Sequence, residues 1–160
     1  EQYREQFAFL RDNGITTRTD MAAFTARTEE TLANLMKQRT VLNVRRKRRR
    51  ALYTALADAE ALAPVKELYE AGLSGMETEF AQYMDAVAAL EQCGVPREGL
   101  IQEKAELYDR LAELNRQIRA ERRKLALCRK TQNSLPRMEQ EIDKAEARES
   151  EVRTNEHRRR

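Results

Sequence analysis

The fold of this chain is decided by one stretch, LYDRLAELNRQIRAERRKLALC, which runs from Leu107 to Cys128. Apolar side chains recur in it at alternating steps of three and four residues, the spacing of one face of an α-helix. The series continues beyond this stretch, and its members are Leu107, Leu111, Leu114, Ile118, Leu125, Cys128, Leu135 and Ile142. A narrow apolar stripe is buried only against another helix, so the stretch predicts a long helix with a helical partner.

A second long helix is predicted upstream, over residues 18–62. This segment has no Gly or Pro, and Thr17 followed by Asp20 forms a variant of the capping box that starts helices. Pro64 is expected to stop or kink it. A Ser74 and Glu77 pair predicts the start of a shorter helix, and Pro136 predicts a bend or break in the last one.

These patterns predict an all-α fold, an elongated antiparallel helical hairpin or coiled-coil-like bundle of two long helices with short hinge helices. With only 5 Gly and 3 Pro and no β-branched alternation, a sandwich or barrel is excluded. Residues 1–147 are expected to form a single elongated domain, and residues 148–160 a polar basic tail that frays. The expected helices are residues 2–12, 18–62, 65–71, 76–92 and 96–147, with the bend near 134–136.

Composition also limits the class of protein. No apolar run approaches the roughly 20 residues that cross a bilayer, so no membrane contact and a cytoplasmic location are expected. The 2 Cys and 1 His rule out a disulfide framework and a four-ligand zinc site, so no metal or cofactor is predicted. Both thiols and the 5 Tyr are expected on apolar helix faces, and no catalytic residue is assigned. Because the chain begins at Glu1 without Met, we expect it to be part of a longer protein.

The net charge of +3, from 30 Lys+Arg and 27 Asp+Glu, conceals two basic blocks around an acidic middle. Neither block contains an acid except for Glu121 in the second, whereas residues 51–115 contain 13 acids and four cations. The first block consists of Arg39, Arg45, Arg46, Lys47, Arg48, Arg49 and Arg50. The second consists of Arg116, Arg119, Arg122, Arg123, Lys124, Arg129 and Lys130.

Six consecutive cations on a helix point all around it, so some must face away from any packed seam, and they repel one another unless anions screen them. Both blocks are therefore predicted to contact DNA phosphate, with affinity that is salt-sensitive and weakly dependent on base sequence. The alternative is a coiled-coil interaction or dimerisation module without direct nucleic-acid binding, in which the same arginines meet acidic partners. A third reading is an inhibitor or enzyme that uses the acidic middle as a DNA mimic.

Three segments together resemble the helical region that follows the nuclease domain in relaxases, or mobilization proteins, of conjugative and integrative elements from Gram-positive bacteria. They are residues 13–20 leading into the long helix, the leucine run ending in residues 45–50, and the distal IRAERRKLALCR at residues 118–129. The chain departs from that pattern where Arg129 and Lys130 follow Cys128. The resemblance implies a non-catalytic DNA-contacting and assembly module, in contact with accessory or coupling proteins of conjugation. The apolar seam from Leu107 to Ile142 is also predicted to support a homodimer.

Overall fold

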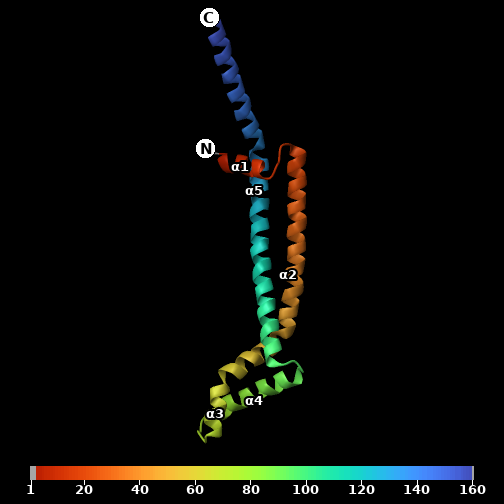
Figure 1. Cartoon of the computed structure of the whole chain (residues 1–160), viewed down its shortest axis with the longest axis vertical. Coiled ribbons are helices and arrows are strands. Elements are labelled where there is room, and N and C mark those ends of the chain that lie inside the picture. The colour runs from red at the N-terminus through yellow and green to blue at the C-terminus, as the bar shows by residue number, and fades with distance from the viewer. Residues whose placement is uncertain (1–2, 160) are drawn as a thin grey trace. The chain divides into compact units, whose positions relative to one another are not determined.

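The computed structural model describes residues 3–159. In this part of the chain all regular structure is helical, which confirms the all-α prediction with two long helices (Figure 1). The helices are α1 (Arg4–Asp12), α2 (Arg18–Ala61), α3 (Ala63–Glu70), α4 (Glu77–Gln92) and α5 (Arg97–Arg158). Predicted starts and ends fall within two residues of these bounds, apart from the end of the last helix.

The tertiary contacts divide the chain into two compact units, where the sequence predicts one domain over residues 1–147. Unit 1 contains the chain up to Asn34 together with the chain from Ile118 onward, and unit 2 is Leu35–Gln117. Each long helix contributes one part to each unit. The hydrophobic clusters follow the same division, because no cluster combines residues of both units.

In unit 1, α2 begins with the predicted capping box. The Thr17 hydroxyl accepts a hydrogen bond from the Asp20 backbone N–H (3.0 Å), and the Asp20 carboxylate accepts bonds from the N–H groups of Thr16 and Thr17 (both 3.1 Å). These bonds, led by the one from the Thr16 backbone, hold the pKa of Asp20 below its ordinary value. The capping box therefore fixes the start of α2 as the sequence predicted.

The core of unit 1 is a small cluster that joins α1, α2 and α5. It contains Phe9, Ile15, Met21 and Cys128, and the ring of Phe24 packs edge-on against that of Phe9 with centroids 5.5 Å apart. The Cys128 side chain has no exposed surface, and burial raises the pKa of its thiol. This cluster explains why α1 packs in unit 1 although it has only 9 residues.

Unit 2 contains two core clusters. The first packs α2 and α4 against the start of α5, and its members are Ala55, Leu56, Ala59, Ala86, Leu90 and Leu100. The second joins Tyr53 of α2 to Leu107 and Leu111 of α5, with Leu42 beside them. Small alanines in the first cluster allow close approach of the helices, as ridges-into-grooves packing requires.

The connection between α3 and α4 differs from its prediction. Met76, not Ser74, occupies the N-cap of α4 and makes no side-chain hydrogen bond to the helix, while the Glu77 carboxylate accepts a bond from the Gly75 N–H (3.3 Å). Gly72 and Gly75 have φ of 90° and 89°, which side-chain-bearing residues rarely adopt. These two left-handed residues extend the turn past Ser74, so the predicted capping box is wrong.

The apolar seam of α5 is buried within the chain over most of its length. Leu107, Leu111, Leu114, Ile118, Leu125 and Cys128 are all buried, whereas Leu135 is half-buried and Ile142 is 45% exposed. The helical partner predicted for this seam is α2 of the same chain, since Leu107 and Leu111 pack on Tyr53. The stretch from Leu107 to Cys128 is therefore not a free surface for a second copy.

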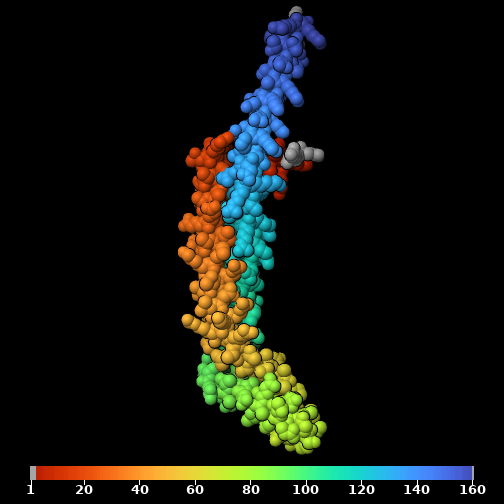
Figure 2. All heavy atoms as spheres, turned by 180° about the vertical axis from the view of Figure 1, so that it is seen from behind, coloured from red at the N-terminus to blue at the C-terminus, as the bar shows by residue number. Residues whose placement is uncertain are grey.

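Helix α5 extends through most of residues 148–160, where the sequence predicts a polar basic tail that frays. The helix continues to Arg158, although the final turns have no other segment beside them in either view (Figures 1 and 2). Helix-forming residues and opposite charges one turn apart, such as Glu149 and Arg153, favour this extension. Pro136 lies inside α5 without ending it, and the helix axis changes direction in this part of unit 1 (Figure 1).

Candidate functional site

The first basic block lies on the part of α2 that belongs to unit 2, and helix geometry divides its cations between two surroundings. Arg45 and Arg49 are one turn apart and face Glu103 of α5. One Glu103 oxygen, Oε1, lies 3.0 Å from Arg49 Nε and 3.5 Å from Arg45 Nη2. The Glu103 side chain is only 15% exposed, so these two arginines share its single negative charge inside the unit.

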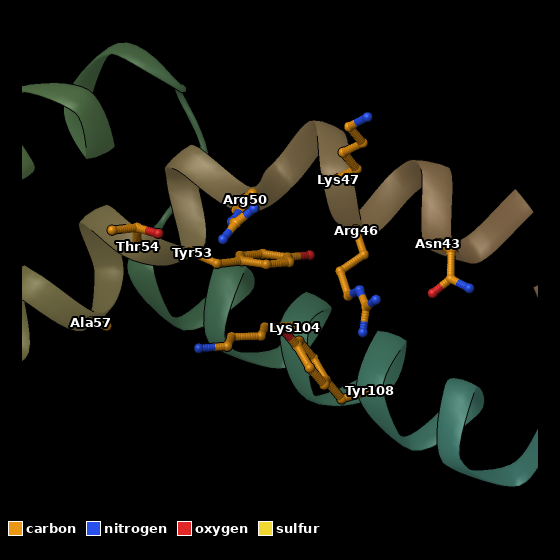
Figure 3. Close-up of a pocket in the computed structure, with 9 residues that line it drawn as sticks. All are labelled: Asn43, Arg46, Lys47, Arg50, Tyr53, Thr54, Ala57, Lys104 and Tyr108. Atoms are coloured by element: carbon orange, nitrogen blue, oxygen red, sulfur yellow. The ribbon is translucent and has the colours of Figure 1, made fainter. Parts of the chain in front are cut away.

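Three other cations of the run line an open cavity of about 880 Å³, here called the basic cavity, although the Lys47 side chain extends away from α5 (Figure 3). Arg46, Lys47 and Arg50 come from α2, and Lys104 joins them from α5. The rest of the lining is Asn43, Tyr53, Thr54, Ala57 and Tyr108, so no carboxylate lines the cavity.

None of these four cations forms an ion pair or a side-chain hydrogen bond with another residue among residues 3–159. Four positive charges without a counter-charge raise the local potential and attract anions from solution. The basic cavity therefore has the electrostatic character of an anion site.

Two tyrosines shape the part of the basic cavity next to Lys104. The Lys104 ammonium lies 5.8 Å from the centroid of the Tyr53 ring and 6.0 Å from that of the Tyr108 ring, which is within cation–π range. Tyr53 is buried, and its hydroxyl donates to Glu103 (3.4 Å). Burial, reinforced by the Glu103 charge, raises the pKa of Tyr53.

Tyr108 differs from Tyr53 because 45% of its surface is exposed. The tyrosines are predicted to lie on apolar helix faces, but Tyr108 and Tyr69, the latter 37% exposed, do not lie in the core. An exposed aromatic ring beside free cations provides a flat apolar surface for a ligand.

Besides Arg45 and Arg49, two further members of the first block lie outside the basic cavity. Arg39 is half-buried and donates a hydrogen bond to Asn115 Oδ1 (3.1 Å), which gives it a structural contact with α5. Arg48 is exposed and does not line the cavity. The structure therefore brings together three of the seven predicted residues of this block.

The second basic block is more neutralised than the first. Arg116 pairs with Glu113 (2.6 Å), which raises the pKa of the guanidinium mainly through the side-chain hydrogen bond. Further along α5, Lys124 pairs with Glu121 (3.0 Å) and Lys130 with Glu5 (3.5 Å). The members of this block without an ion pair in the described part of the chain are Arg119, Arg122, Arg123 and Arg129, all of them exposed.

A smaller cavity of about 580 Å³ lies beside this block within unit 1. Arg123, Lys124 and Lys130 line it together with Glu5 and Phe9. Because it includes a carboxylate and two of its cations are already paired, its attraction for anions is weaker than that of the basic cavity. The two blocks thus contribute to separate sites, one in each unit.

Sequence reasoning missed the α5 side of the basic cavity. Lys104 and Tyr108 are four residues apart on one helix face, next to the buried Leu107. If α2 and α5 are paired antiparallel with Leu107 against Tyr53, Lys104 and Tyr108 lie opposite residues 46–50. That register, rather than local composition, is the signal that could have identified them.

Residues 3–159 contain neither a metal-binding cluster nor a membrane-spanning helix. No group of three or more His, Cys, Asp or Glu side chains is arranged to hold a metal ion. None of the helices has a segment long and apolar enough to span a bilayer. Comparisons with protein-family models, with curated proteins and with solved structures found no match to the chain.

Proposed function

We propose that this chain is a non-catalytic DNA-contacting module whose basic cavity in unit 2 binds phosphate. One observation carries the proposal: Arg46, Lys47, Arg50 and Lys104 meet around a cavity with no carboxylate and no internal counter-charge. Arginine adds paired N–H donors that match two phosphate oxygens. A charge arrangement of this kind favours a polyanion over a neutral ligand.

DNA fits this arrangement because its phosphates repeat along a backbone. Each phosphate that a cation neutralises releases condensed counterions, so affinity falls as salt rises and depends little on base sequence. Arg48 and the exposed, unpaired arginines of the second block add further positive charge for such a backbone. The side chains already paired to Glu103 contribute less, since their charge is compensated within the protein.

The resemblance of residues 13–20, 45–50 and 118–129 to relaxase helical regions supports a more specific setting. On that basis we extend the proposal to an assembly role in a DNA-processing protein of the relaxase or mobilization type, with accessory or coupling proteins as partners. The phosphate contact is independent of this extension.

The test is a salt titration of DNA binding with two matched triple variants. The first replaces Arg46, Lys47 and Arg50 with Gln, and the control replaces Arg148, Arg153 and Arg158, which lie on the last turns of α5. Both variants remove three positive charges. For duplex DNA, we expect the first to reduce the slope of log K against log [salt] by about 2–3, and the control by less than about 1.

Two results would contradict the proposal. Absence of binding to either duplex or single-stranded DNA at low salt would favour the coiled-coil interaction module. Equal losses for the two triple variants would mean that net charge alone, without the basic cavity, accounts for the binding.

A further inference from the structure

A second cavity adjoins the basic cavity in unit 2. It has a volume of about 430 Å³, and Leu56, Ile101 and Ala105 line it together with three residues that also line the basic cavity: Ala57, Lys104 and Tyr108. Its one carboxylate belongs to Glu60. We call it the apolar groove, because aliphatic side chains predominate in its lining.

The two cavities differ in chemistry on either side of the same tyrosine. Tyr108 is 45% exposed and Ile101 is 54% exposed, so the apolar groove presents uncovered aromatic and aliphatic surface. The basic cavity presents four cations that lack an internal partner. A ligand that fills both must carry a flat apolar part and an anionic part close to each other.

We propose that the joined cavities bind one nucleotide of single-stranded DNA, with its base on the Tyr108 ring and its phosphate among Arg46, Arg50 and Lys104. This inference rests on the proposed function, which requires only phosphate contact. It adds a preference for unpaired strands and assigns the residue that provides it.

The geometry favours a single strand over a duplex for a physical reason. In a duplex both faces of each base are stacked on neighbouring base pairs, so a side chain can reach only the base edges. In a single strand the base faces are free, and proteins that bind such strands combine cationic grooves with aromatic rings on which bases stack. The Glu60 carboxylate at the apolar groove can accept a hydrogen bond from an amino group on a base edge.

Lys104 links the two halves of the site. Its ammonium lies near both tyrosine rings, which holds the charge at the junction of the cavities. A phosphate bound there would place the attached nucleoside within reach of the Tyr108 face. Because Tyr53 is 4% exposed, its ring supports Lys104 but does not itself offer a stacking surface.

The experiment compares three labelled ligands of equal length by fluorescence anisotropy at low salt: a single strand, an abasic single strand and the matching duplex. The variants of the full chain are Tyr108→Ala, Tyr108→Phe and, as a control, Met84→Ala, which removes an exposed apolar side chain on α4. We expect Tyr108→Ala to reduce the ratio of single-strand to abasic affinity by about 5-fold or more. Tyr108→Phe and Met84→Ala should keep that ratio within about 2-fold.

The outcomes separate this inference from the proposed function. If all three ligands bind but Tyr108→Ala leaves the ratio unchanged, or if the wild-type chain binds abasic and ordinary strands equally, the inference is overturned and phosphate contact stands. If no ligand binds, both fail. Because Tyr108→Phe keeps the ring in place, its recovery of the ratio distinguishes stacking from an effect on folding.

Discussion

Replacement of Glu103 by Gln should change stability and DNA affinity in opposite directions. The Glu103 carboxylate contacts Arg49, Arg45 and the buried Tyr53 hydroxyl. Loss of its charge removes attractions that stabilise unit 2. The same loss releases two arginines next to the basic cavity.

The stability term can be worked from the individual contacts. The Arg49 contact at 3.0 Å involves a side chain that is 35% exposed, which corresponds to about 0.5–1 kcal/mol. The Arg45 contact is longer, at 3.5 Å, and 57% exposed, so it adds only a few tenths of a kcal/mol by the same reasoning. The Gln amide oxygen can still accept from Tyr53, so most of that hydrogen bond is kept. We expect a loss of about 1 kcal/mol, or about 2–4 °C in Tm.

The affinity term has the opposite sign. Because Glu103 does not line the basic cavity, its charge lies beyond contact distance from a bound phosphate, where a unit charge is worth less than about 1 kcal/mol in water, so we expect a gain of up to about five-fold in DNA affinity at low salt. Thermal unfolding followed by circular dichroism gives the first quantity, and a DNA titration gives the second. A double-mutant cycle with Arg49→Gln checks that the stability loss comes from this pair. A fall in both quantities would refute our view of Glu103 as a neutralising group, and would show that it positions the arginines for DNA.

Four further predictions concern the folded chain. Leu114→Ala should destabilise the protein by about 2–5 kcal/mol in urea unfolding, because the Leu114 side chain is fully buried. Ile142→Ala changes a site that is 45% exposed, so it should change the free energy of unfolding by less than about 0.5 kcal/mol. Similar losses for the two variants would contradict the burial of the seam. Thr17→Ala should cost about 1 kcal/mol by removing the cap of α2. The folded state holds the pKa of Asp20 below its unfolded value, so the ionised Asp20 carboxylate stabilises the fold above about pH 4, and this stabilisation is lost as pH falls through the lower folded pKa. Asp20→Asn should therefore weaken the decrease in the free energy of unfolding at acid pH. An unchanged decrease would count against the capping box. Pro136→Ala should raise Tm, because a proline inside a helix removes a backbone hydrogen bond and clashes with the preceding turn. A lower Tm would mean that the change of direction in α5 is needed for packing.

The helices could be predicted from the sequence because their determinants are local. The alternating apolar ladder from Leu107 onward identified the buried face of α5, and Thr17 with Asp20 identified the first turn of α2 to the residue. The errors also have local causes. At Ser74 the pattern of a capping box was present, but the left-handed Gly75 displaced the helix start to Glu77. In the tail, the prediction of fraying rested on polarity, whereas the Arg and Glu residues there favour a helix.

The candidate site was only half predictable because it depends on contacts between distant segments. Counting charges along α2 identified Arg46, Lys47 and Arg50 but could not separate them from Arg45 and Arg49, which Glu103 neutralises. That separation requires the register between α2 and α5. Lys104 was set aside as one cation in an acidic segment, because nothing near it in the sequence shows that it faces the arginines.

The two thiols give each unit a reporter of its own without any substitution. Cys128 has no exposed surface and lies in the core of unit 1, so a thiol reagent can reach it only when that unit opens. Cys93 in unit 2 is partly exposed at the end of α4, where its thiol donates to the Leu90 carbonyl (3.0 Å), so it can react in the folded state. The labelling rate of Cys128 as denaturant is added measures the free energy of local opening in unit 1, and Cys93 in the same sample supplies the internal rate standard.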